Sequence, residues 1–371
     1  MFKPKKSIAA VDLFYLTKEL QVLIGAKIDS IYQKEKLDLT LVFHLSSVGK
    51  KVVKIQVPDY LALIESKEAF DSPGGFCMFL RKHLKSARLQ SVEQMGFERI
   101  VRFVFSTKTE SYELYLEFIP PGNILLVKDK IILSAVHYEK FKARVIRPNV
   151  EYIYPTKEIS AISLSQNDLK SLFEKTQKET LVTLLAIDLG LGGVYAEEFC
   201  LRAEIDKNML PKEVDVNTVH QGLKELFSQN INAQLVETPQ GSIDGIPFPF
   251  KLYTSLKTTS LPSFSDALEK YFTSQRPKII SGSQKREEKL HSILEAQQKA
   301  LESITKEQEE YAKKGEWLYH HYQQLQSFLQ KAGIEARKHG VGSLKNKIID
   351  GIKIKNVNQQ KKRIAIEMEE R

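Results

Sequence analysis

Apolar side chains recur at two different spacings along the first half of the chain. Leu13, Leu16, Leu20 and Leu23 lie three or four residues apart, which predicts an amphipathic helix over 9–24 that stops at Gly25. The segments that follow are short, rich in β-branched residues and partly alternating, as in strands. The expected strands are 27–33, 37–45, 52–57, 89–95, 100–106, 112–118, 123–127 and 131–136. Eight short strands with few helices predict an α+β domain built on a β-sandwich or barrel-like sheet.

A second amphipathic helix is expected over 76–84, between the first strands and the later ones. Its apolar residues fall on one face, and basic residues flank that face. Such a rim is usually only a solvated surface. A basic loop follows the last expected strand. The candidate RNA contacts in these two segments are Arg81, Lys82, Lys85, Lys140, Lys142 and Arg144.

A helical pattern over 164–226 contains three glycines within four residues, Gly190, Gly192 and Gly193. Two interpretations of this turn stay open. Amide groups of a glycine turn beside a helix N-terminus can bind phosphate. Alternatively, small residues allow a close helix–helix crossing, and the nearly all-apolar helix after the turn favours this packing interpretation. The Gly-rich turn before Tyr195-Ala196 resembles the helix-two-turn-helix of formamidopyrimidine-DNA glycosylases.

Apolar residues alternate spacings of four and three from about 285 to 331, which predicts a long coiled-coil helix. An unpaired coiled-coil stripe is costly to expose, so we expect it to self-associate, to dock on the globular part of its own chain or to pair with a neighbouring molecule. Two strands are expected over 352–370.

Composition limits the function classes. The chain has 371 residues, a formal net charge of +9 and two cysteines. The charge favours a polyanionic partner, most commonly RNA. Cys77 and Cys200 are far apart without a Cys-x-x-Cys motif, so we expect no metal and no organising disulfide. No apolar run is long enough to span a bilayer and no signal peptide is recognisable. We therefore expect a cytoplasmic protein without a membrane partner or a cofactor.

The order of several motifs is similar to that of the NFACT family, whose members act in ribosome-associated quality control and are also called fibronectin-binding protein A-like. The matching motifs are Asp12 before Glu19-Leu20, 79–84 (FLRKHL), 96–100 (GFERI), 122–126 (GNILL), the Tyr195-Ala196-Glu197-Glu198 helix, 263–268 (SFSDAL) and the heptad helix. Each motif is modest, but their order together is specific.

The resemblance implies four segments. These are a glycosylase-like, β-rich N-terminal domain over 1–155, a helical domain with the glycine turn over 156–280, the coiled-coil helix over 281–335, and the start of a middle domain over 336–371. The family continues with a returning helix and a small RNA-binding domain, so the chain is expected to be truncated relative to it.

The resemblance also implies a function. Family members are non-enzymatic adaptors that bind large ribosomal subunits obstructed by peptidyl-tRNA and recruit aminoacyl-tRNA for template-free C-terminal tailing. The implied partners are the rRNA of the large subunit, tRNA, and a ubiquitin ligase or another quality-control factor.

The tRNA-binding residues implied by the family are Asp12, Glu98, Arg99 and Asn123. The family usually has Asp-Arg where this chain has Glu98-Arg99, which keeps the charge but lengthens its reach. A guanidinium at the start of a strand can bind phosphate or a base edge. A structural alternative is an Arg99–Asp12 ion pair that ties the first helix to the sheet.

Two other function classes fit the sequence less well. A DNA-binding or repair protein of glycosylase-like fold is the first, but the chain begins Met1-Phe2-Lys3 and lacks the Pro-Glu nucleophile and the zinc finger of those enzymes. An adhesin is the second, suggested by the older family name. The missing export signal and the basic charge argue against it.

Overall fold

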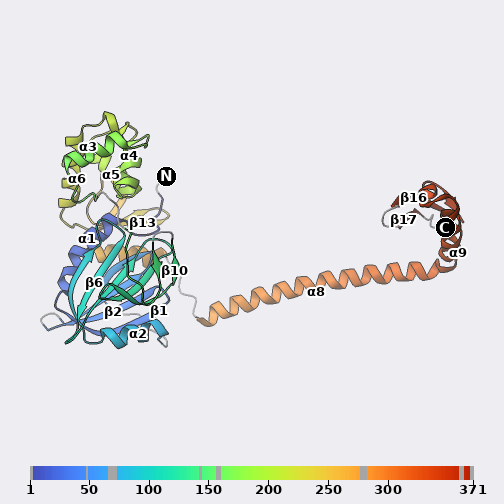
Figure 1. Cartoon of the computed structure of the whole chain (residues 1–371), viewed down its shortest axis with the longest axis horizontal. Coiled ribbons are helices and arrows are strands. Elements are labelled where there is room, and N and C mark those ends of the chain that lie inside the picture. Colours follow the sequence, from blue (N-terminus) through green and yellow to red (C-terminus); the bar gives the residue numbers. More distant parts are fainter. Residues whose placement is uncertain are drawn as a thin grey trace. The chain divides into compact units, whose positions relative to one another are not determined.

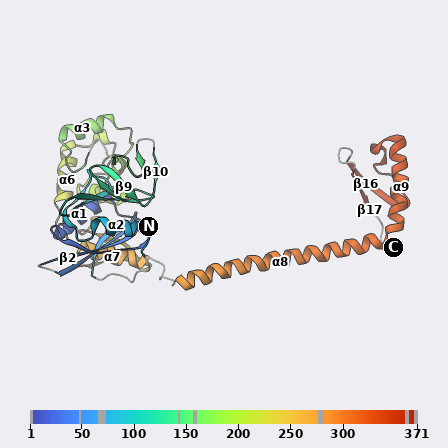
Figure 2. The same ribbon diagram turned by 60° about the horizontal axis from the view of Figure 1, so that its bottom comes forward.

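The computed structural model describes residues 3–46, 49–65, 73–141, 144–155, 160–275, 282–358 and 363–367. It divides into two units, residues 1–277 and 278–371. Figure 1 and Figure 2 show their elements, and each unit is described by itself.

The first unit is built on one antiparallel sheet of nine strands in the order β4-β3-β2-β1-β5-β6-β7-β8-β9. The strands are β1 (Lys27–Glu35), β2 (Asp38–Leu45), β3 (Gly49–Gln56), β4 (Tyr60–Ile64), β5 (Arg88–Gln94), β6 (Ile100–Ser106), β7 (Ser111–Glu117), β8 (Asn123–Lys128) and β9 (Ile131–Ala135). All eight expected strands are present. The pattern missed β4, whose five residues are nearly all apolar and buried, so they show no alternation.

The nine strands form one continuous sheet, where a β-sandwich or a barrel-like sheet was expected. Its halves meet where β1 pairs with β5, and the register there holds a single pair, Lys27 with Arg88. Phe43 of β2 nevertheless stacks on Phe105 of β6, with ring centroids 6.3 Å apart. The two halves therefore face each other across a shared apolar core.

Helix α1 (Ala10–Leu20) and the short 3-10 turn Gln21–Leu23 fill the predicted N-terminal helix. Helix α2 (Gly75–Leu84) packs against β1, and α7 (Phe264–Gln275) packs against β4 and β13. The carboxylate of Glu19 in α1 accepts hydrogen bonds from the amides of Phe264 (2.6 Å) and Ser265 (2.9 Å). Glu19 thus caps α7, which gives both of these family motifs a structural role.

The remaining helices gather at one end of the unit, with α2 at the other end (Figure 1). They are α3 (Gln166–Lys175), α4 (Leu181–Thr183), a π-helical turn (Leu184–Asp188), α5 (Gly193–Arg202) and α6 (Val216–Ser228). A small sheet follows, of β12 (Gln234–Thr238), β13 (Gly241–Ile246) and β14 (Lys257–Ser260). This sheet was not predicted from the sequence, because Gly241 and Gly245 interrupt the apolar alternation of β13.

The second unit begins with α8 (Gly282–His320) and continues in α9 (Tyr322–His339). The predicted single helix is thus interrupted at His321, whose ring stacks on Trp317. Strands β15 (Ile348–Ile349), β16 (Ile352–Asn358) and β17 (Arg363–Glu367) form a sheet against α9 around Phe328. Apolar positions of α8 such as Leu301 and Tyr311 are exposed, so coiled-coil pairing stays a prediction.

Candidate nucleic-acid interface

A cavity of about 570 Å³ lies in the first unit, at the end where α5 approaches the sheet. Three segments surround it: the N-terminal residues 3–10, the turn 97–99 before β6, and the glycine turn with the start of α5. Of the residues singled out from sequence, Glu98, Arg99, Gly190, Gly192 and Gly193 all line this cavity.

The glycine turn is shaped by backbone conformation. Gly190 and Gly192 have φ values of +74° and +82°. Gly192 also has ψ 158°, a region that only glycine occupies readily. A side chain on Gly193 would meet nothing within 4 Å, so this residue opens onto free space.

The helices on either side of the turn contact each other, since α4 and the π-helical turn both pack against α5. This contact does not require a small residue at 193, because a Cβ on Gly193 would meet nothing within 4 Å. The close approach lies on α6, where a Cβ on Gly222 would come within 2.9 Å of the Phe199 ring in α5. The packing interpretation of the glycine turn is therefore wrong for Gly193. Helix α5 begins at Gly193, and the amides of residues 193–195 donate no hydrogen bond to any acceptor among the described residues.

Arg99 lies directly before β6, and its backbone carbonyl accepts a hydrogen bond from the Phe118 amide at 2.7 Å. The guanidinium Nη1 is 3.4 Å from the Ser7 hydroxyl. Within the described part of the chain no carboxylate lies in ion-pair distance of Arg99. Burial lowers the pKa of Arg99, and the charge of Glu98 acts in the opposite direction. Arg99 is thus a half-buried cation that lines the cavity, close enough to Glu98 to sense its charge but without an ion pair to any carboxylate of the described residues.

Asp12 is fully buried behind the cavity wall. Its carboxylate accepts hydrogen bonds from the Tyr195 hydroxyl (2.6 Å) and the Ala9 amide (2.6 Å). It also pairs with the Lys5 ammonium at 3.1 Å. The predicted Arg99–Asp12 ion pair is therefore wrong: Asp12 ties α1 to α5, and Lys5 takes the place expected for Arg99.

Lys5 lies between two carboxylates, because Asp244 of β13 is 2.7 Å from its ammonium. Burial disfavours the charge of Lys5, but Asp12 and Asp244 outweigh burial and raise its pKa. Burial also raises the pKa of Asp244 to about 6, although Lys5 opposes this. Tyr253 donates to Asp244 at 3.1 Å. These side chains, with Asp12 and Tyr195, form the buried cluster beneath the cavity.

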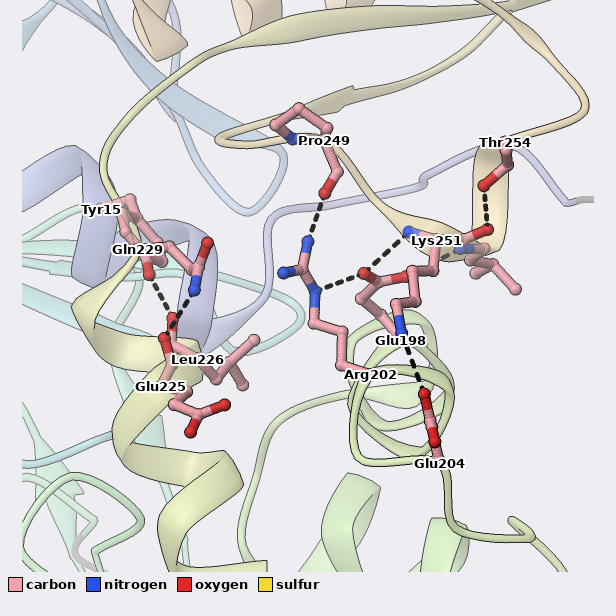
Figure 3. Close-up of polar contacts among 11 residues, drawn as sticks. Tyr15, Glu198, Arg202, Glu204, Glu225, Leu226, Gln229, Pro249, Lys251 and Thr254 are labelled. Atoms are coloured by element: carbon pink, nitrogen blue, oxygen red, sulfur yellow. Dashed lines mark hydrogen bonds and ion pairs between the residues drawn. The ribbon is translucent and has the colours of Figure 1, made fainter.

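Glu198, the second acid of the Tyr-Ala-Glu-Glu motif, holds the opposite side of α5. Its carboxylate accepts from the amides of Lys251 (2.9 Å) and Leu252 (2.8 Å) and from Arg202 (2.6 Å). Figure 3 shows Glu198 between Arg202 and Lys251, while Arg202 also donates to the Pro249 carbonyl. The motif thus places α5 through buried polar bonds on both faces.

Asn123 and Arg144 line a second cavity of about 560 Å³, which shares Ile119 with the first. Asn123 is buried, and its amide nitrogen donates to the His137 carbonyl at 2.9 Å. The Arg144 guanidinium lies 3.0 Å from the Glu117 carboxylate, which raises the pKa of Arg144 against the effect of burial. Both residues are engaged within the fold.

The remaining basic candidates are dispersed. Arg81, Lys82 and Lys85 line a hollow beside α2, which lies at the other end of the unit from α5 (Figure 1). Arg81 also donates to the Ile31 carbonyl at 2.8 Å. Lys140 is exposed on the short strand β10 (Glu139–Lys140), and Lys142 lies outside the described residues.

Sequence reasoning missed the contribution of the N-terminal segment. Lys3, Lys5, Lys6 and Ser7 all line the first cavity. Three lysines within four residues were visible in the sequence, but only the fold shows that the segment adjoins Arg99.

The family assignment rests on a match along nearly the whole chain. The model of the NFACT N-terminal and middle domains matches residues 10–343. The chain belongs to the NFACT family. In addition, none of the helices in the described ranges is long and apolar enough to cross a membrane.

Curated relatives of this NFACT chain carry ribosome quality control names. The archaeal Rqc2 homolog aRqcH of Methanocaldococcus jannaschii is 29% identical over 346 residues, covering 88% of this chain and 52% of the relative. The Rqc2 homolog RqcH of Bacillus subtilis is 26% identical, covering 53% of this chain and 38% of the relative. The chain thus spans about half, or less, of the length of the curated relatives it matches.

Solved structures support the same fold. The N-terminal part of the fibronectin/fibrinogen-binding protein of Streptococcus suis matches with a TM-score of 0.60 and 23% identity, covering 72% of this chain and all of that one. The fibrinogen binding protein of Staphylococcus aureus matches with a TM-score of 0.59 and 16% identity, covering 71% and 98%. At these identities the similarity shows the fold alone.

Proposed function

We propose that the chain is a non-enzymatic, cytoplasmic RNA-binding adaptor of ribosome quality control. In this proposal it binds large ribosomal subunits obstructed by peptidyl-tRNA and recruits aminoacyl-tRNA for template-free C-terminal tailing. The names of the curated relatives and the family match support the ribosome quality control role. A ubiquitin ligase or another quality-control factor is the further partner.

The observation that carries the proposal is the first cavity. Arg99, without a carboxylate partner in the described chain, and the unused amides at the start of α5 face the same space. A guanidinium binds phosphate or a base edge through paired hydrogen bonds, and amides at a helix start favour an anion. Glu98 adds an acceptor that suits a base amino group or a ribose hydroxyl.

The buried residues have a different role in this proposal. Asp12 is enclosed by Tyr195, Ala9 and Lys5, so it holds the wall of the site and does not touch tRNA. Asn123 likewise supports the edge of the neighbouring cavity through His137. Arg99 and Glu98 are the residues that we assign to tRNA contact.

The test is the Arg99→Ala variant with a fluorescently labelled tRNA. Loss of a bidentate guanidinium contact should weaken binding by about 1–3 kcal/mol, while the melting temperature shifts little. Arg88→Ala is the matched control, since Arg88 is an exposed arginine of the same sheet. Equal tRNA affinity of the Arg99→Ala variant and the wild type would contradict the assignment.

Ribosome association needs a separate measurement. Co-sedimentation with large subunits that carry peptidyl-tRNA, compared with empty subunits, should show a preference for the obstructed ones. Equal recovery with both would contradict the adaptor proposal.

A further inference from the structure

The N-terminal segment, residues 3–9, is fastened to the fold at several points. The Lys5 amide donates to the Ile243 carbonyl at 2.9 Å, and the Lys5 carbonyl accepts from the Tyr271 hydroxyl at 2.7 Å. The Ile8 amide donates to the Asp59 carbonyl at 2.9 Å. These bonds reach β13, α7 and the turn before β4, so the segment has a fixed course along the cavity.

The side chain of Lys5 is the strongest of these attachments. It is 7% exposed, forms an ion pair with Asp244 at 2.7 Å and donates hydrogen bonds to the Gly245 carbonyl at 3.0 Å and to Asp12 at 3.1 Å. A buried cation held by two carboxylates and a carbonyl is confined to one position. We call this arrangement the Lys5 latch.

The neighbouring lysines differ from Lys5 in their exposure. Lys3 and Lys6 are exposed and line the cavity, and neither has an ion-pair partner among the described residues. Of the acids lining the cavity, Asp244 faces the Lys5 ammonium, which leaves Glu98 against Lys3, Lys6 and Arg99. The cavity therefore carries an excess of positive charge, which fits an anionic chain.

We propose that the N-terminal segment is one wall of the anion-binding site, in which Lys3 and Lys6 contact phosphate groups of RNA and the Lys5 latch holds them in place. Lys3 and Lys6 are binding residues, and Lys5 is a positioning residue. The inference rests on the proposed function, because it takes tRNA as the ligand of the cavity. It adds a charged wall that neither the motifs nor the relatives' names assign.

The experiment measures binding of a fluorescently labelled tRNA transcript from about 50 to about 200 mM KCl. The proteins are the wild type, K3Q/K6Q, K5M and the triple variant K3Q/K5M/K6Q. The double variant should bind about tenfold more weakly at the lowest salt. Its slope of log Kd against log salt should fall by about one to two, since each phosphate contact contributes roughly one.

The latch is tested by the coupling between variants. If Lys5 positions the other two lysines, K5M should lose a similar affinity and salt slope, and the triple variant should lose little more than K5M alone. K5R, which keeps the charge, should restore part of the affinity. Independent, additive losses of affinity would overturn the positioning role, because Lys5 would then affect binding without acting through Lys3 and Lys6.

Two controls keep the outcome decisive. K170Q/K175Q removes the same charge from exposed lysines of α3 and should leave affinity near the wild-type value. If K3Q/K6Q binds tRNA as tightly as this control, the proposal that Lys3 and Lys6 contact phosphate is contradicted. If K5M does not fold at the assay temperature, D244N, which leaves the Lys5–Asp12 pair, replaces it in the same cycle.

Failure of the proposed tRNA role can be distinguished from failure of the phosphate-binding wall. A wild-type chain that binds tRNA and duplex DNA equally would overturn the tRNA role. The effect of K3Q/K6Q on either probe would then still decide whether the wall binds phosphate.

Discussion

The buried cluster beneath the cavity and the open wall above it differ in how their polar groups are satisfied. Asp12 has three partners within the fold, whereas the Arg99 side chain has one long hydrogen bond, to Ser7, among the described residues. Both residues belong to the same set of family motifs. The difference teaches that one family's motifs can include both residues that build a site and residues that stay available for a ligand.

The largest effect that tests this difference is expected from Asp12→Ala. Removing it leaves the Tyr195 hydroxyl and the Ala9 amide without their acceptor and Lys5 with one carboxylate fewer. The free energy of unfolding should fall by about 3 kcal/mol, as for other broken buried ion pairs. Urea titration of Asp12→Ala beside Arg99→Ala measures this, and equal losses in the two variants would erase the distinction.

A smaller effect separates two glycines of the turn. Gly192→Ala should cost about 1–3 kcal/mol, because φ +82° with ψ 158° strains any other residue. Gly193→Ala has free space for its methyl group and should be neutral or slightly stabilising. Thermal melting gives the stabilities. If Gly193→Ala destabilises as much as Gly192→Ala, the turn is a packing element after all.

The smallest effect concerns pH. Burial raises the pKa of Asp244 to about 6, above its ordinary value of 3.8, so the folded state binds this proton more tightly than the unfolded state. The stabilisation from protonation is present below pH 4 and is lost as pH rises through 6. Between pH 7 and pH 5 the wild type should gain about 1 kcal/mol relative to Asp244→Asn. A constant difference between the two proteins over this range would contradict the shifted pKa.

Most of the sheet could be predicted from the sequence, because its strands alternate or are β-branched and are separated by clear turns. Strand β4 and the β12–β13–β14 sheet could not, because a fully buried strand and a glycine-interrupted strand lack a period of two. Local pattern also missed the break at His321, since the heptad spacing continues through it.

The candidate site was predicted in part. Arg99 and the glycine turn were singled out from motifs, and the fold places them on one cavity. The role of Lys5 could not be predicted, because it depends on Asp244, which lies 239 residues later in the chain. Spacing along the sequence carries no information about such a pair. The assignment of Arg99, Glu98 and the basic residues to RNA contact stays a prediction.

The attachment of the N-terminal segment also bears on the order in which a ribosome delivers this chain. The partners of the first dozen residues include Tyr195, Asp244 and Tyr271, which leave the exit tunnel long after α1 has been made. The N-terminal segment therefore lacks its contact with Tyr271 until at least 271 residues have been synthesised. Contacts of such long range slow folding, because the closing of the loop must precede the gain from the contact. The bond between the Lys5 carbonyl and the Tyr271 hydroxyl can therefore form only after α7, the last helix of the first unit, has been synthesised.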